Sequence, residues 1–105
     1  MGIVATGFAD AAKRADHFQA HGRDCGTATA TEYEQMAIGF LNAALVVTMV
    51  ECVRLGNGDT IRYDRATDFF AVMRPDGVIK TFYKPERSWH GFSGNLRYFQ
   101  VECGK

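Results

Sequence analysis

The sequence predicts an α+β domain in which two N-terminal helices pack on a four-stranded antiparallel sheet, followed by a short C-terminal element. Two observations support this fold class. Residues 58–85 contain three runs of β-forming residues separated by turn-forming ones. Between residues 33 and 44, apolar side chains recur at the spacing of an amphipathic helix. The chain has 105 residues, of which 47% are hydrophobic, so we expect one domain with a real core, spanning residues 1–105.

The first helix is expected over residues 8–21. Its apolar positions share one face, and they are Phe8, Ala11, Ala12, Ala15 and Phe18. Gly22 follows as a natural helix stop. Residues 1–7 are small and carry no pattern, so we expect a frayed start.

The second helix has the clearest signal in the chain. Thr31 and Glu34 match a capping box, with Thr31 as the N-cap. The apolar stripe that follows needs a hydrophobic partner, which predicts that Phe40 is buried against the sheet.

Four strands are expected after the helices. Residues 45–55 are rich in β-branched side chains and predict the first strand. Residues 56–59 form a hairpin turn signal. The remaining strands are expected at residues 60–63, 69–73 and 78–83, separated by turn-like segments at 64–67 and 74–77.

Strict alternation assigns side chains of the last strand to its two faces. It predicts Thr81 on the same face as Ile79 and Tyr83, with Lys80 and Phe82 on the opposite face. The small sheet would then bury one face and present polar groups on the other.

The chain changes character after Pro85. Residues 86–95 show no periodicity and are expected to form a loop over the sheet. Two structures fit residues 96–103 equally well. One is a short helix that buries Leu96, Phe99 and Cys103, and the other is a strand with alternating apolar residues.

Cysteine usage and charge exclude several classes of protein. Cys25, Cys52 and Cys103 are odd in number and form no CxxC pair, which favours reduced or buried thiols over a disulfide framework or a zinc ribbon. Twelve basic and twelve acidic residues balance, which argues against a general nucleic-acid binder but allows a local basic patch. We expect no signal peptide, and the uncharged run at 35–50 is too short for a membrane span.

His17 and His21 stand four residues apart, so they share a face of the first helix. The simplest reading is a pair of partly exposed helix histidines. Half of a zinc site is a second reading, although no third ligand stands out. A third is acid–base catalysis, for which imidazole has a suitable pKa near neutrality. Spacing alone favours the first reading.

Several other side chains have a structural and a functional reading. Arg62 fits a solvated strand face, or a fixed guanidinium that holds a phosphate. Thr81 is a good strand former that could donate to a phosphate, and Lys84 is a candidate phosphate contact. Tyr98 and His90 could stack on a base, although aromatic side chains in a small domain more often belong to the core.

Four motifs together carry a resemblance to a known family: HFQAHG at 17–22, TEYEQMAIGFL at 31–41, GDTIRYDRATDFFAVMRPDGVIKTFYKP at 58–85 and YF at 98–99. The chain resembles the C-terminal ribonuclease toxin domains of bacterial contact-dependent inhibition and other polymorphic toxin systems. These belong to the barnase, EndoU, colicin and RelE-like group of ribonucleases. The spacing between RYD at 62–64 and TFYKP at 81–85 is the most specific part, and the histidine pair is next.

The resemblance implies a compact endoribonuclease that uses no metal and cleaves RNA, usually tRNA, through a 2′,3′-cyclic phosphate. It implies a toxin delivered as part of a larger secreted effector, acting in the cytoplasm of the target cell and neutralised by an immunity protein. Carried over by motif, the catalytic residues would be His17, His21, Arg62, Thr81 and Tyr98. Lys84, Tyr83 and His90 would contact the substrate. The zero net charge departs from this pattern and suggests a small target defined by its shape.

A non-catalytic binding module, such as a phage or secretion-system adaptor, is the alternative. Geometry separates the two hypotheses. In the enzyme, the two histidines, Arg62 and Thr81 must converge on one cleft, whereas in the module Arg62 would point to open solvent away from the helix.

Overall fold

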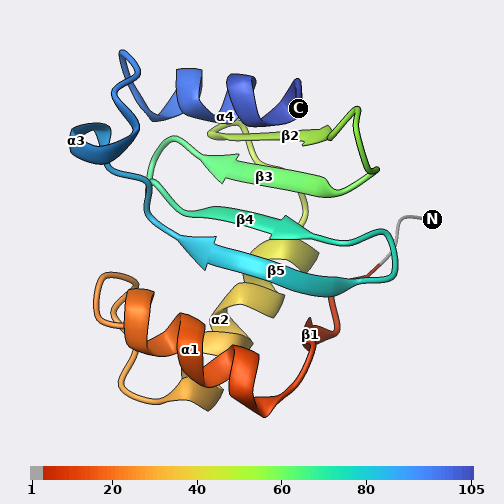
Figure 1. The fold of residues 1–105 in the computed structure, drawn as a ribbon, viewed down its shortest axis with the longest axis vertical. Coiled ribbons are helices and arrows are strands. Elements are labelled where there is room, and N and C mark those ends of the chain that lie inside the picture. Colours follow the sequence, from red (N-terminus) through yellow and green to blue (C-terminus); the bar gives the residue numbers. More distant parts are fainter. Residues whose placement is uncertain (1–3) are drawn as a thin grey trace.

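The computed structural model of the protein describes residues 4–105 and shows an α+β fold around a mixed sheet (Figure 1). The described part of the chain forms a five-stranded sheet with the strand order β1-β5-β4-β3-β2. The bounds are β1 Gly7–Phe8, β2 Met49–Val53, β3 Thr60–Asp64, β4 Phe70–Met73 and β5 Val78–Tyr83. β2 to β5 are antiparallel to their neighbours, and β1 runs parallel to β5. The expected sheet of four antiparallel strands therefore gains a fifth, parallel strand.

The added strand lies where a frayed start was expected. Ala5 is buried, and its backbone N–H donates to Asn42 Oδ1 at 2.8 Å. Gly7 and Phe8 pair with Val78 and Ile79 of β5. The expectation is therefore wrong for residues 5–7, while residues 1–3 lie outside the described part.

Helix α1 runs over Ala11–His21 and begins later than expected, because Phe8 belongs to β1. The Asp10 side chain accepts a hydrogen bond from the backbone N–H of Lys13, as an N-cap does. Gly22 ends the helix, as predicted, and donates its N–H to the Phe18 carbonyl.

Helix α2 spans Ala30–Asn42, and its cap lies two residues before the predicted one. Thr29 accepts from the Glu32 backbone N–H at 3.1 Å, and the Glu32 carboxylate accepts from the Ala28 N–H at 3.2 Å. The sequence contains two overlapping Thr-x-x-Glu patterns, and the first one forms the cap. Glu34 instead accepts from the backbone N–H of Phe8 and holds β1 in place.

The three strands expected over residues 60–83 are confirmed, but β2 is shorter than its predicted range because residues 45–47 are exposed and precede it. A bulge also interrupts β5. Met73 pairs with Ile79 and Val72 with Thr81, so Lys80 is the extra residue. The bulge moves Ile79 to the face of Phe82, and Thr81 stays on the face of Tyr83. Strict alternation was therefore wrong for Ile79.

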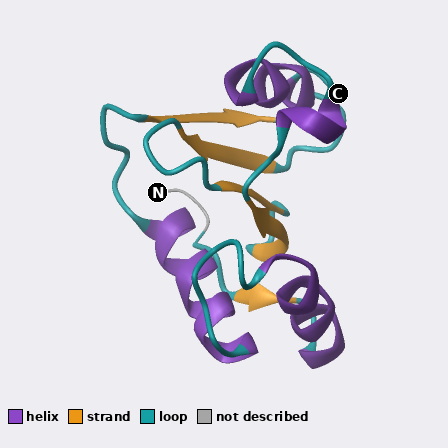
Figure 2. Ribbon diagram, turned by 90° about the vertical axis from the view of Figure 1, so that its left-hand side faces the viewer, coloured by secondary structure: helices purple, strands orange, loops and turns teal. Residues whose placement is uncertain are grey.

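The sheet has a hydrophobic cluster on each face. One contains Phe40, Ala71, Ile79 and Phe82 and lies beneath α1 and α2, which confirms that the two N-terminal helices and the buried Phe40 pack on one face. The other cluster joins β3 and β4 to a C-terminal helix. Figure 2 shows that helix, which ends at the C-terminus, at one end of the molecule and the two N-terminal helices at the other.

The C-terminal segment forms two helices, α3 at Arg87–His90 and α4 at Asn95–Cys103. The helical alternative for residues 96–103 is therefore the one observed. Phe99 is buried as expected for it, whereas Leu96 is exposed. The short α3 replaces part of the expected loop. No helix in residues 4–105 has the length and apolar character needed to cross a membrane.

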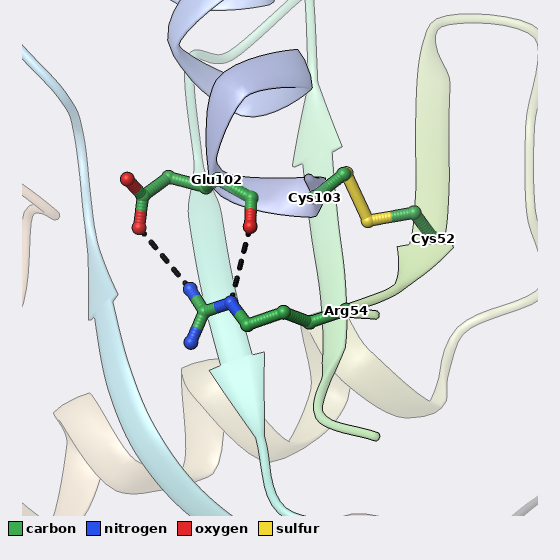
Figure 3. Close-up of a disulfide and its surroundings, with 4 residues drawn as sticks. All are labelled: Cys52, Arg54, Glu102 and Cys103. Atoms are coloured by element: carbon green, nitrogen blue, oxygen red, sulfur yellow. Dashed lines mark hydrogen bonds and ion pairs between the residues drawn. A yellow bond between two sulfur atoms is a disulfide. The ribbon is translucent and has the colours of Figure 1, made fainter. Parts of the chain in front are cut away.

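A disulfide joins Cys52 of β2 to Cys103 of α4, with Cα atoms 6.1 Å apart. The expectation of three reduced or buried thiols is therefore wrong for this pair, and only Cys25 is free and buried. Beside the bridge, Arg54 donates to the backbone carbonyl and to the carboxylate of Glu102, both at 3.1 Å (Figure 3). The disulfide and this ion pair anchor the end of α4 to the sheet.

Candidate functional site

His17 and His21 lie on the face of α1 that looks toward β1 and β5. Both are half-buried, and their ring centroids are 6.2 Å apart. His17 stacks on Phe8 with centroids 5.1 Å apart, and His21 stacks on Tyr83 at 5.0 Å. Each imidazole is thus held by an aromatic ring of the neighbouring strand, which fixes the histidine pair against the sheet.

The ring contacts continue from His21 across the end of β5 to α4. The hydroxyl groups of Tyr83 and Tyr98 share a hydrogen bond. His90 stacks on Tyr98, with centroids 4.8 Å apart and an angle of 11° between the planes. We call His17, His21, Tyr83, Tyr98 and His90 the edge cluster. The structure therefore brings five of the sequence-predicted site residues into one continuous row.

His90 holds its neighbours in place and has little capacity left for a ligand. Its Nδ1 accepts from the backbone N–H of Phe92 at 3.1 Å, and its Nε2 lies 2.9 Å from Asn95 Oδ1. Nε2 is therefore the ring nitrogen that carries the hydrogen, and it donates a hydrogen bond to Asn95 Oδ1. Since one face of the ring also covers Tyr98, His90 positions that tyrosine, which differs from the substrate contact that was expected.

Thr81 and Lys84 lie on different faces of the sheet. Thr81 stands two residues before Tyr83 on the same face of β5, next to the edge cluster. The ammonium of Lys84 lies 5.2 Å from the centroid of Phe69, and Phe69 packs with the core beneath α2. Thr81 is therefore placed for a role beside the tyrosines, whereas Lys84 lies on the side of α1 and α2.

Arg62 does not join the histidines. Its side chain is 7% exposed, and Nη1 donates to the carbonyls of Phe40 at 2.9 Å and Ala43 at 2.6 Å. Nε and Nη2 contact Glu51, both at 2.9 Å. The guanidinium thus satisfies the carbonyls at the end of α2, which a helix leaves without partners. The predicted convergence of Arg62 with the histidines on one cleft is wrong, and so is the alternative in which it points to open solvent.

Burial changes the acidity of the edge cluster. It lowers the pKa of His17, an effect that Asp16 partly opposes. Burial also lowers the pKa of His21, and the nearby His17 lowers it further. Burial raises the pKa of Tyr83 and of Tyr98, so both phenols stay protonated. At neutral pH the histidines therefore favour the uncharged form that accepts a proton, and the tyrosines can donate hydrogen bonds.

A pocket of about 270 Å³ opens beside His17. Four groups on its wall carry or can carry positive charge, and its other lining residues are apolar or small. The cationic residues are Lys13, His17, Arg74 and Lys80. The wall includes no carboxylate, so the pocket suits an anion.

The sequence analysis missed Lys13, Arg74 and Trp89. Lys13 stands four residues before His17, so helical spacing places it on the same face and was a usable signal. Arg74 follows β4 and reaches the pocket through the pairing of β4 with β5. Trp89 contacts Tyr83 and Tyr98 and is 55% exposed, which only the three-dimensional position of α3 reveals.

Within residues 4–105, no three His, Cys, Asp or Glu side chains cluster as a metal site would require. The hypothesis that His17 and His21 form half of a zinc site therefore finds no further ligand among the described side chains.

No protein-family model matches the chain, and no curated protein matches it in sequence. The resemblance to ribonuclease toxins therefore stays a prediction, and the functional argument rests on the side chains described above.

Proposed function

We propose that the protein is a metal-independent endoribonuclease whose proton-transfer groups are His17 and His21. One observation carries this proposal. Two half-buried imidazoles lie side by side on one helix, next to a cationic pocket and a row of aromatic rings. Imidazoles supply the acid and the base, cations attract the phosphate, and rings offer stacking surfaces for bases. The sequence resemblance to ribonuclease toxins supports the same activity.

The proposed reaction uses the 2′-hydroxyl of the RNA as the nucleophile. One imidazole removes the proton of that hydroxyl, and the oxygen attacks the adjacent phosphorus. The other imidazolium protonates the departing 5′-oxygen. The products are a 2′,3′-cyclic phosphate and a 5′-hydroxyl.

The charged neighbours of the two imidazoles suggest which one acts as the acid and which as the base. After burial, the strongest influence on the pKa of His17 is Asp16, which raises it against the weaker opposing effect of Lys13. After burial, the strongest influence on the pKa of His21 is His17, which lowers it against the weaker opposing effect of Asp24. We therefore assign the acid to His17 and the base to His21. A protonated His17 also places positive charge beside the phosphate, a role that the buried Arg62 does not perform.

The resemblance extends the proposal to tRNA as substrate and to an immunity protein as partner. A blocker of this site would have to cover the histidines and the cationic pocket, and carboxylates would do so best. We expect an acidic immunity protein over the edge cluster or over an adjoining surface. Absence of a complex, with no rescue of growth on co-expression, would contradict this part.

Incubating the purified protein with total tRNA tests the activity directly. Wild type should cut tRNA, and His17→Ala and His21→Ala should lose the activity while keeping the fold, because alanine is well tolerated in helices. Thermal unfolding of each variant provides the control for folding. Equal cleavage by wild type and by both variants would refute the role of the histidines, and binding of RNA without any cleavage would favour the non-catalytic module.

A further inference from the structure

The pocket beside His17 is separate from the stacked rings of the edge cluster, and only His17 belongs to both. Phe8, Val78 and Ile79 contribute apolar side chains to its wall, and the cationic side chains come from α1, β5 and the residue after β4. Residues from β1, α1, β5 and the position after β4 therefore line one pocket of about 270 Å³.

The carboxylates near the pocket leave the cations available. Asp76 pairs with Arg74 at 2.7 Å, but both side chains are about half exposed, and such pairs exchange readily with solvent. Asp59 pairs with Lys80 at 2.7 Å. Asp59 is also within 3.5 Å of Arg54, so its single charge is shared between two cations. Neither carboxylate lines the pocket, and Lys13 is exposed on its wall.

The pocket continues the proposed reaction site. His17 lines the pocket and also lies next to His21 on the same face of α1. A phosphate held between the two imidazoles therefore has Lys13, Arg74 and Lys80 on one side. On the other side, Tyr83 stacks on His21, and the exposed ring of Trp89 lies beyond it. An RNA strand carries a phosphate on each side of the scissile one, whereas bases offer flat faces for stacking.

We propose that this pocket binds the phosphate next to the scissile phosphate, and that the substrate is an unpaired RNA strand, one base of which stacks on the exposed ring of Trp89. This inference rests on the proposed function for the position of the scissile phosphate. Tight binding of RNA then requires a second phosphate in the pocket. The position of the pocket also sets the direction in which the RNA strand crosses β5.

Binding of short, non-cleavable RNA tests the pocket without any need for catalysis. The probes are a 2′-O-methyl dinucleotide with no terminal phosphate, the same dinucleotide with a 5′-phosphate, and the same dinucleotide with a 3′-phosphate. Because the pocket lies on one side of the histidines, one of the two terminal phosphates should strengthen binding roughly ten-fold, and the other should have a smaller effect.

The gain should disappear in the double variant Lys13→Gln, Arg74→Gln, whose two side chains are exposed and whose folding is checked by thermal unfolding. Arg65→Gln is the matched control, since it removes an exposed arginine at the opposite end of β4 and should keep the full gain. Equal gains from both phosphates, persistence of the gain in the double variant, or no measurable binding of either phosphorylated probe would overturn the proposal.

The binding experiment, together with the tRNA cleavage assay of the proposed function, separates this inference from that function. If wild type cleaves RNA and the terminal phosphates add nothing, the pocket assignment is wrong and the ribonuclease stands. If the phosphate gain depends on Lys13 and Arg74 but no RNA is cleaved, the pocket is a phosphate site and the ribonuclease proposal fails.

Discussion

His21 lies nearly face to face with Tyr83, with ring centroids 5.0 Å apart and an angle of 27° between the planes. This contact joins α1 to β5, and the hydroxyl of Tyr83 continues it to Tyr98 on α4. Three segments that are distant in sequence thus meet at one edge of the sheet. The proposed proton transfers depend on these contacts, because they hold His21 in place against β5.

The pH dependence of cleavage should peak on the acid side of pH 6.5. Burial lowers the pKa of both histidines below the ordinary value of 6.5. A reaction that needs one neutral and one protonated imidazole is fastest between the two pKa values, so its optimum moves down with them. The profile of kcat/KM against pH measures this for the free enzyme.

Asp16→Asn provides the matched control for the profile. Asp16 raises the pKa of His17, so its loss should lower that pKa and move one limb of the profile to lower pH. A rate that keeps rising above pH 8 would contradict the assignment of acid and base to these histidines.

A substrate with a good leaving group should separate the roles of His17 and His21. An activated aryl leaving group departs without being protonated, so it removes the need for a general acid. His17→Ala should therefore recover most of its activity on a uridine 3′-(4-nitrophenyl) phosphate. His21→Ala should stay impaired, because the 2′-hydroxyl still needs a base. Release of nitrophenolate measures both, and the reverse pattern would exchange the two roles.

Arg62→Met should destabilise the fold, and any loss of activity should follow from that. The change leaves the Phe40 and Ala43 carbonyls and the Glu51 carboxylate without the guanidinium. A buried carbonyl left without a donor costs about 1–3 kcal/mol of unfolding free energy, and the Glu51 carboxylate adds less because its side chain is 31% exposed. Urea denaturation measures the loss, with Arg97→Gln as the control that changes little, because Arg97 is exposed and contacts the Gln100 side chain at 3.5 Å. An Arg62 variant with full stability and no activity would instead restore the phosphate-binding role.

Reduction of the Cys52–Cys103 disulfide should lower stability markedly. The bridge closes a loop with a sequence separation of 51 residues. In the chain-entropy model such a loop contributes about 4 kcal/mol. Urea denaturation with and without reductant measures the effect, and Cys103→Ser should make the protein insensitive to reductant. Burial raises the pKa of Cys25 to about 11, so this thiol should not interfere. An unchanged midpoint under reducing conditions would show that the bridge contributes nothing.

Local sequence patterns were sufficient for most of the fold. Helix α2 and strands β3 to β5 could be predicted from apolar periodicity and turn residues, because these signals depend only on residues close together in the sequence. The fifth strand was missed because Gly7 and Phe8 are held by pairing with β5 and by Glu34, neither of which is visible locally. The bulge at Lys80 was missed for the same reason.

The candidate site was predicted in part, and the errors have a common cause. Helical spacing identified the pair His17 and His21 correctly as neighbours. The partners of Arg62 are backbone carbonyls at the end of α2, and those of Cys52 depend on where α4 crosses the sheet. The residue type alone suggested that Arg62 binds phosphate. In the folded protein, however, its guanidinium donates to the carbonyls at the end of α2.

The end groups of the cleaved RNA test the central claim most directly. Wild type should cut an end-labelled RNA in the presence of EDTA as fast as without it, because imidazoles do the proton transfers. Every cut should leave a 2′,3′-cyclic phosphate and a 5′-hydroxyl, and folded His17→Ala and His21→Ala should leave the RNA intact. Cuts that end in a 3′-hydroxyl and a 5′-phosphate, or activity that EDTA abolishes and zinc restores, would contradict the account.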